Sequence, residues 1–133
     1  MRVLSITILI LCILLSCTST RQGNAVQASE VQEGDTIRIA NDSLEYEITI
    51  IEPGFNFWLQ TRPPRGYYGL QYLERKNKFW VLTYNRRSQQ PTKFGDLYQP
   101  SIPYEIDVEY GYEVNYMLFN YLVYFQEQYN QKL

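Results

Sequence analysis

The 133-residue sequence contains no histidine. It therefore lacks the side chain whose ordinary pKa lies nearest neutral pH, which is also the commonest metal ligand in proteins. The motifs G-x-S-x-G, G-x-x-x-x-G-K-[ST], G-x-G-x-x-G and H-E-x-x-H are absent as well. These absences argue against the common hydrolase, nucleotide and zinc-protease sites. We expect a non-enzymatic protein with no cofactor and no metal ion.

The sequence also lacks a strong excess of either charge. Twelve basic and fourteen acidic residues give a net charge of −2, so nothing draws the chain to nucleic acid, and we expect no nucleic-acid partner. Charged residues make up 20% of the chain and hydrophobic residues 45%, which is typical of a globular protein. The length suits one small domain, and thirteen tyrosines are its most unusual feature.

Only one long apolar run is present, from Val3 to Leu15, and it follows the positive charge of Arg2. A membrane-spanning helix needs about 20 apolar residues, so the run is too short to span but long enough for the core of a signal peptide. A buried helix is the alternative, but the run has no polar face and polar residues follow it directly.

The run ends in Leu14-Leu15-Ser16-Cys17, which resembles the lipobox of bacterial lipoproteins. The resemblance implies that residues 1–16 are a signal peptide and that Cys17 becomes the acylated N-terminus, which inserts into the lipid bilayer. An ordinary signal peptide or an uncleaved anchor is the alternative. Cys12 would leave with the signal peptide, so the mature domain would have no free thiol, disulfide or zinc site. By the same resemblance, Thr18 in place of Asp implies sorting to the outer membrane of the cell envelope.

Residues 17–35 are polar and have no clear period, which predicts a flexible tether, and residues 36–133 then form one small domain. Alternating apolar and polar residues predict a β-hairpin with strands at 36–40 and 44–51, joined by Asn41-Asp42-Ser43. Because a hairpin alone is marginal in water, we expect helices to cover its apolar face.

Three helices are predicted after the hairpin. A short one runs from Phe55 to about Thr61, and a longer one from about Leu70 to Arg87, although residues 79–84 could instead form a strand. Prolines predict an irregular region from 88 to about 107. The last helix, from about Tyr110 to Gln128, is apolar on most faces and should lie at the centre of the core. The fold class is therefore α+β.

Two asparagines interrupt the apolar faces of the last predicted helix. Asn115 and Asn120 would need partners, because a buried amide without a hydrogen bond costs a few kcal/mol. Tyrosine hydroxyls or the backbone of a loop are the expected partners.

Four stretches of the predicted domain resemble a family of small lipoproteins of unknown function from Gram-negative bacteria. They are Asn41-Asp42-Ser43-Leu44-Glu45-Tyr46-Glu47, Pro64-Arg65-Gly66-Tyr67-Tyr68, Asn85-Arg86-Arg87 and Tyr110-Gly111-Tyr112-Glu113-Val114-Asn115-Tyr116. This resemblance covers most of residues 41–125 and implies no known activity.

Charge is segregated along the chain. Residues 62–93 contain one acid, Glu74, and eight basic residues: Arg62, Arg65, Arg75, Lys76, Lys78, Arg86, Arg87 and Lys93. Residues 94–133 contain six acids and one base, Lys132. A basic face for phosphate or carboxylate groups is one interpretation. Pairing between the two halves, or solvation of both, is the favoured one.

Five residues are candidates for a binding site: Arg65, Tyr67, Tyr68, Arg86 and Arg87. Tyrosine and arginine are enriched at protein interfaces, and both also suit sugar rings. The alternative is structural, with the two tyrosines covering the core and Arg86 and Arg87 capping helix carbonyls.

Two acidic features of the sequence are candidate sites. Glu105, Asp107 and Glu109 alternate and could offer oxygens to Ca²⁺, but they match no EF-hand loop, and a solvated edge is favoured. Glu113 could act with a loop acid on a glycosidic bond, although nothing in the spacing supports this over a structural role. The sequence thus predicts an envelope-tethered protein-binding or assembly module. A glycan or anionic-polymer binder is the first alternative and a small hydrolase a distant one.

Overall fold

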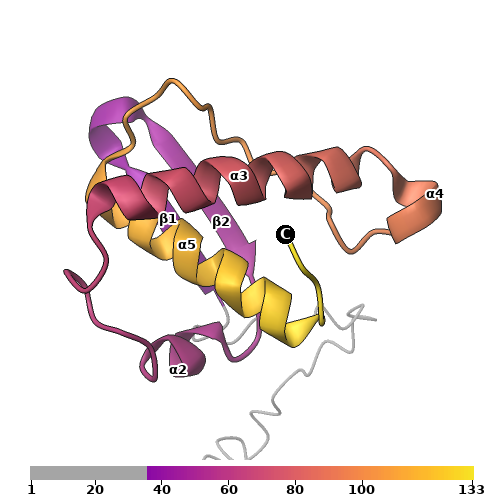
Figure 1. The fold of residues 1–133 in the computed structure, drawn as a ribbon, viewed down its shortest axis with the longest axis horizontal. Helices are drawn as coiled ribbons and strands as arrows, with labels where there is room; N and C mark the ends of the chain where they lie inside the picture. Colours follow the sequence, from indigo (N-terminus) through magenta and orange to yellow (C-terminus); the bar gives the residue numbers. More distant parts are fainter. Residues whose placement is uncertain (1–35) are drawn as a thin grey trace, which may run out of the picture. The chain divides into compact units, whose positions relative to one another are not determined.

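A computed structural model describes residues 36–133, and Figure 1 shows their arrangement. The predicted signal peptide, Cys17 and the predicted tether lie outside the described residues. The elements in chain order are β1 (Thr36–Asn41), the 3₁₀ turn η2 (Asp42–Leu44), β2 (Tyr46–Ile51), α2 (Phe55–Leu59), α3 (Leu70–Ser88), α4 (Pro91–Phe94) and α5 (Gly111–Gln128). The α+β prediction is confirmed.

The predicted hairpin forms from β1 and β2, which pair antiparallel with Thr36 opposite Ile51 and Asn41 opposite Tyr46. Ile37 and Ile39 point into the core, as their alternation with Arg38 predicts. The second strand begins at residue 46 rather than 44, because Leu44 belongs to the turn. The Asn41 side chain accepts a hydrogen bond from the Ser43 N–H, which starts that turn.

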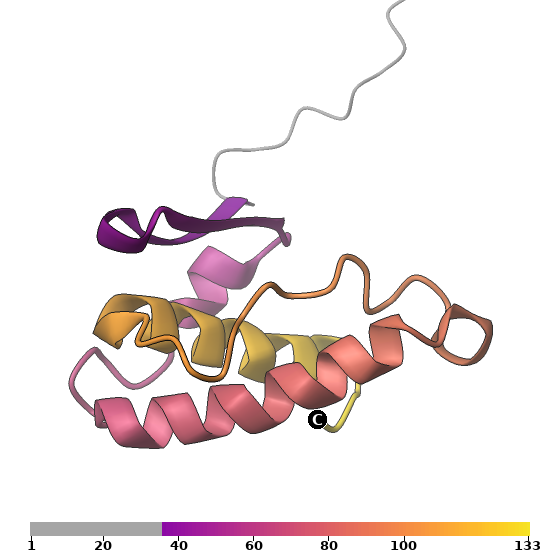
Figure 2. The ribbon, with the colours of Figure 1, turned by 90° about the horizontal axis from the view of Figure 1, so that it is seen from above.

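Helix α5 is central, as predicted. Its buried residues recur on almost every side, and Leu118 and Leu122 are completely buried. Figure 2 shows the hairpin on one side of α5 and α3 on the other, so the described domain has three layers. Both outer layers bury their apolar faces against this one helix.

Helix α3 confirms the second long helix and rules out a strand at residues 79–84. The helix contains no proline or glycine, and its inward positions follow the helical repeat. Leu73, Asn77, Val81, Tyr84 and Ser88 are all buried along that side. Helical spacing over the whole segment therefore outweighs the strand-like apolar run within it.

The other connections differ slightly from the predictions. Helix α2 follows Pro53-Gly54, where Gly54 has a φ of 81° that favours glycine, and it ends two residues before Thr61. The region from 88 to 107 is not wholly irregular, because Pro91 begins the short helix α4. No helix among residues 36–133 has both the length and the apolar character to cross a membrane.

Candidate functional site

The structure separates the five predicted binding residues into two groups. Arg65, Tyr67 and Tyr68 lie in the loop before α3, whereas Arg86 and Arg87 lie in its last turn. At a rise of about 1.5 Å per residue, the part of α3 between Leu70 and Arg86 separates the two groups by about 24 Å along the helix axis. They do not form one site.

Arg65 lies in an internal ion pair. Its Nε donates to Glu113 Oε2 at 2.8 Å, and its guanidinium lies 4.6 Å from the centre of the Tyr116 ring. The hydrogen bond to Glu113 raises the pKa of Arg65 above its ordinary value. Arg62 pairs in the same way with Glu127. Two of the eight basic residues are thus joined to acids of the last forty residues.

Tyr68 packs against the domain, while Tyr67 is exposed. The Tyr68 ring stacks on Tyr72 at 4.9 Å and contacts Phe119 at 5.3 Å. Tyr67 stands edge-on to Tyr68 at 4.7 Å. Tyr68 therefore covers the core, as the structural alternative proposed, and Tyr67 is the one of the pair that faces solvent.

Arg87 binds the C-terminal segment of the chain through hydrogen bonds. Its guanidinium donates to the Tyr98 hydroxyl at 2.7 Å and to the Lys132 carbonyl at 2.8 Å. These contacts differ from the helix-carbonyl cap that the sequence suggested, because the C-terminal segment turns back from the end of α5 toward α3 (Figure 1). Arg86 points into solvent.

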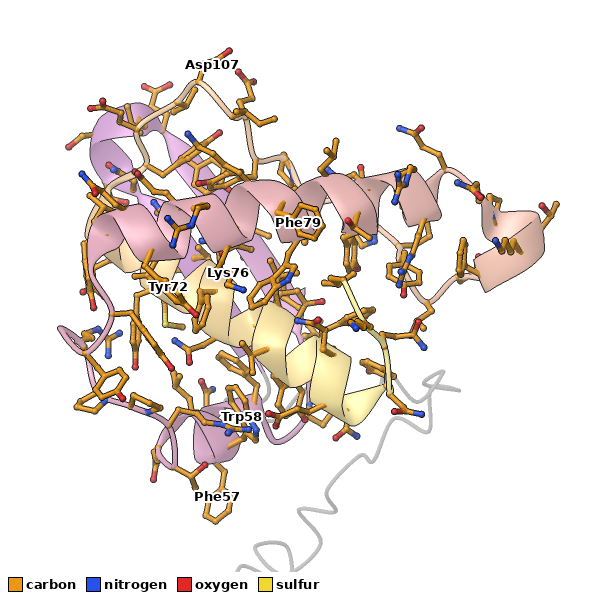
Figure 3. All side chains as sticks on the ribbon, viewed as in Figure 1. Phe57, Trp58, Tyr72, Lys76, Phe79 and Asp107 are labelled. Atoms are coloured by element: carbon orange, nitrogen blue, oxygen red, sulfur yellow. The ribbon has the colours of Figure 1, made fainter. Side chains whose placement is uncertain are left out.

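The acidic candidates lie in two places, the segment before α5 and the first turn of α5 itself. Glu105, Asp107 and Glu109 are exposed in the segment before α5, and Figure 3 shows Asp107 at its tip. Among residues 36–133, no cluster of His, Cys, Asp or Glu could hold a metal ion. Glu113 pairs with Arg65 rather than with a second acid.

The buried asparagines are hydrogen-bonded to a tyrosine hydroxyl, as expected, and also to another asparagine and to a backbone carbonyl of their own helix. Asn115 Oδ1 accepts from the Tyr104 hydroxyl at 2.8 Å and from Asn77 Nδ2 at 3.0 Å. Asn120 Nδ2 donates to the Tyr116 carbonyl of its own helix at 2.8 Å. These amides belong to the core and not to a ligand site.

One face of α3 is exposed, apolar and basic. Arg75, Phe79, Leu82 and Arg86 follow at helical spacing on the side opposite the buried positions, and we call these four residues the outer stripe. Phe79 is 62% exposed and Leu82 59%. Figure 3 shows Tyr72, Lys76 and Phe79 following one another along this helix.

Residues beside the outer stripe extend it. The exposed Ile106 and Leu82 border a depression of about 90 Å³, which Lys78 also lines. Lys76 lies 5.3 Å from the Trp80 ring centre, which holds a further positive charge over the helix. Arg75, Lys78 and Arg86 form no ion pair within residues 36–133. The result is an apolar patch with a cationic rim.

A second surface feature is a cavity of about 480 Å³ beside β2. Its walls come from Ile48 to Glu52, from the segment 96–102 and from aromatic residues of α3 and α5. Glu52 is only 8% exposed, and its Oε1 accepts a hydrogen bond from the Tyr129 hydroxyl at 2.6 Å. That bond raises the pKa of Tyr129 to about 12.

Comparison with known families matches residues 4–133 to DUF6146, a family of unknown function. The match spans nearly the whole chain. The chain belongs to DUF6146. No curated protein matches it, and no solved structure does either. The predicted membership of a family of unknown function is thereby confirmed, and the family's description assigns no role to any residue.

Neither the outer stripe nor the cavity beside β2 was predicted for this DUF6146 chain, although the sequence contains a sign of the stripe. Phe79 and Leu82 lie in an apolar run, Phe79-Trp80-Val81-Leu82, which the sequence alone allows as either helix or strand. Once that run is helical, Val81 faces inward and Phe79 and Leu82 must face outward. The Glu52 cavity left no such signal, because segments far apart in the chain build it.

Proposed function

We propose that this DUF6146 chain is a non-enzymatic, lipid-anchored protein of the bacterial cell envelope that binds another envelope protein through the outer stripe of α3. The observation that carries the proposal is the exposed apolar pair Phe79 and Leu82 between two arginines. Contiguous apolar patches rimmed by polar residues are uncommon on proteins that act alone, and they mark interaction sites.

The anchor in this proposal is Cys17. The sequence Leu14-Leu15-Ser16-Cys17 supports acylation there, and Thr18 supports delivery to the outer membrane. Three acyl chains would hold the protein stably, since two membrane-binding signals already suffice. The domain would then act near the membrane, within the distance that residues 17–35 can span.

The position of α3 supports the choice of this face. Thr36, where the described domain begins, lies in the hairpin layer, and α3 forms the layer on the other side of α5 (Figure 2). The outer stripe therefore points away from the layer that joins the predicted tether.

The chemistry of the stripe defines the partner surface. Arg75 and Arg86 lie about 16 Å apart along the helix, with Phe79 and Leu82 between them. A complementary surface would offer an apolar centre for those two side chains and a carboxylate near each arginine. Bidentate pairing of arginine with carboxylate would fix the register of the two proteins.

An anionic glycan or envelope polymer is the competing ligand, since both charged residues of the outer stripe are arginines. The two ligands differ in what they need from the stripe. A protein interface depends on its apolar centre, whereas a polyanion depends on the basic rim and weakens steeply with salt.

Crosslinking in cells tests the proposal with the full-length chain. The variants are the apolar pair Phe79→Ala with Leu82→Ala, the rim pair Arg75→Gln with Arg86→Gln, and the control Phe57→Ala, which removes an aromatic side chain that is 77% exposed on α2. We expect one protein adduct in the wild type and the control, its loss in the apolar pair and its reduction in the rim pair. Adducts of polysaccharide alone, lost only in the rim pair, would contradict the proposal and favour the polymer.

A further inference from the structure

The cavity beside β2 is a separate site, and its walls carry charge of one sign only. Glu52 and Asp96 are its charged residues among the described lining residues, and no lysine or arginine lines it. Its volume of about 480 Å³ lies within the range of small-ligand pockets. The electrostatics of this cavity therefore favour a cation.

Glu52 is the centre of that charge. Its side chain is more than nine-tenths buried, yet no cationic side chain of residues 36–133 pairs with it. The Tyr129 hydroxyl supplies one hydrogen bond to Oε1, whereas a carboxylate can accept about four. A buried charge is costly unless it is paired, so a cation entering the cavity would relieve that cost.

Aromatic side chains line the cavity around Glu52. Tyr84 and Tyr121 are two of these residues, and burial raises the pKa of both. With Phe125 and Tyr129 they present rings to the same space. Aromatic faces attract ammonium and guanidinium groups, which adds to the attraction of the carboxylate.

The shape of the ligand follows from β2. The sheet has two strands, so within the described residues no third strand pairs with the outer edge of β2. In an antiparallel pair, alternate residues direct their backbone groups away from the partner strand. Residues 48–51 of β2 line the cavity. An extended peptide placed along this edge could pair with β2 and turn a side chain toward Glu52.

We propose that this cavity binds an extended peptide segment, which adds to the outer edge of β2 and places a lysine or arginine side chain against Glu52. The segment would lie between β2 and residues 96–102. This second site is independent of the outer stripe, so a negative result here leaves the proposed function of α3 untouched.

A charge-matched pair of peptides provides the test. The probes are acetyl-Thr-Val-Arg-Val-Thr-amide and the same peptide with citrulline, a neutral isostere, in place of arginine. Each is titrated into the isotope-labelled full-length chain in detergent, and backbone amide shifts are followed by NMR. We expect shifts at 48–52 and 96–102, with about tenfold weaker binding of the citrulline peptide, since a charge-assisted hydrogen bond is lost.

Variants of the protein then locate the charge. Glu52→Gln should weaken the arginine peptide about tenfold and leave the citrulline peptide unchanged. Asp107→Asn, which neutralises an exposed acid outside the cavity, should change neither. If Glu52→Gln unfolds the domain, the comparison of the two peptides on the wild type still decides the matter.

Three outcomes would overturn the inference. Equal affinity for the two peptides would remove the role of the carboxylate. Shifts confined to α3 would move the peptide to another surface. The absence of shifts with millimolar arginine peptide would show that the cavity does not take an extended cationic segment.

Discussion

The side chain of Asn77 on α3 donates from Nδ2 to both the backbone carbonyl and the side-chain oxygen of Asn115 on α5, at 2.9 and 3.0 Å. Both residues are fully buried. Tyr104 donates to the same oxygen, and Asn115 Nδ2 donates to the Gly111 carbonyl at 2.8 Å. One polar network therefore joins α3, α5 and the segment between them inside an otherwise apolar core.

Replacing the centre of that network should be costly. Asn115→Ala would remove the oxygen that accepts hydrogen bonds from the Tyr104 hydroxyl and from Asn77 Nδ2. We therefore expect a loss of about 1–3 kcal/mol in the free energy of unfolding. Urea denaturation of the full-length chain measures it. Gln71→Ala, at an exposed position of α3, should change it by less than about 0.5 kcal/mol. Equal effects of the two changes would show that the network contributes nothing to stability.

Substitution of two leucines, one in the core and one in the outer stripe, should have different effects on stability. Leu118→Ala should lower the free energy of unfolding by about 2–5 kcal/mol, because it opens a cavity in the centre of α5. Leu82→Ala removes the same atoms from an exposed position of α3 and should cost about 0.5 kcal/mol or less. Thermal denaturation of both variants checks the assignment. An unchanged melting temperature for Leu118→Ala would remove α5 from the core.

Stability should fall at alkaline pH. The Glu52 hydrogen bond raises the pKa of Tyr129 to about 12, and burial raises that of Tyr104 to about 12, against about 10 in an unfolded chain. The unfolded state therefore loses these protons first. Their contribution to stability is fully present below about pH 10 and is lost as the pH rises toward 12.

Denaturation at a series of pH values measures this loss, and tyrosinate absorbance reports the ionisation. In Tyr129→Phe the fall in stability between about pH 10 and 12 should be shallower, because one raised pKa is gone. A variant whose stability falls as steeply as that of the wild type would contradict the assignment of this pKa to the bond with Glu52.

The ion pair of Arg65 with Glu113 should contribute little to stability. Both side chains are more than half exposed, so water screens their attraction. A double-mutant cycle with Arg65→Gln and Glu113→Gln should give a coupling of about 0.2–1 kcal/mol that decreases with added salt. A coupling well above that range, or one insensitive to salt, would mean that the pair is shielded from solvent.

Periodicity predicted the elements whose residues face one side throughout. The alternation of Ile37 and Ile39 identified β1, and the apolar repeat around Leu118 identified α5. Pro91 predicts a break in regular structure, but proline also suits the first turn of a helix, and α4 begins there. Local pattern therefore predicted the ends of the long elements better than the segment between them.

The surface sites were harder to predict, for two physical reasons. Arg65 and Arg86 are both candidates from the sequence, but most of helix α3 lies between them, and the first is held in an ion pair. The cavity around Glu52 depends on β2 meeting residues 96–102, which no local period encodes. The exposure of Phe79 could not be predicted without knowing that residues 79–84 are helical, because a strand would place different residues of the run on its outer face.

The most direct test of the central claim places a photo-crosslinking amino acid at residue 79 of the full-length chain in cells, with residue 57 as the control. Both positions carry an exposed phenylalanine, one in the outer stripe and one on α2, where Figure 3 shows it pointing away from the domain. We expect one protein adduct from residue 79, lost when Arg75→Glu and Arg86→Glu are added, and none from residue 57. Equal adducts from both positions, or none from residue 79, would contradict the claim.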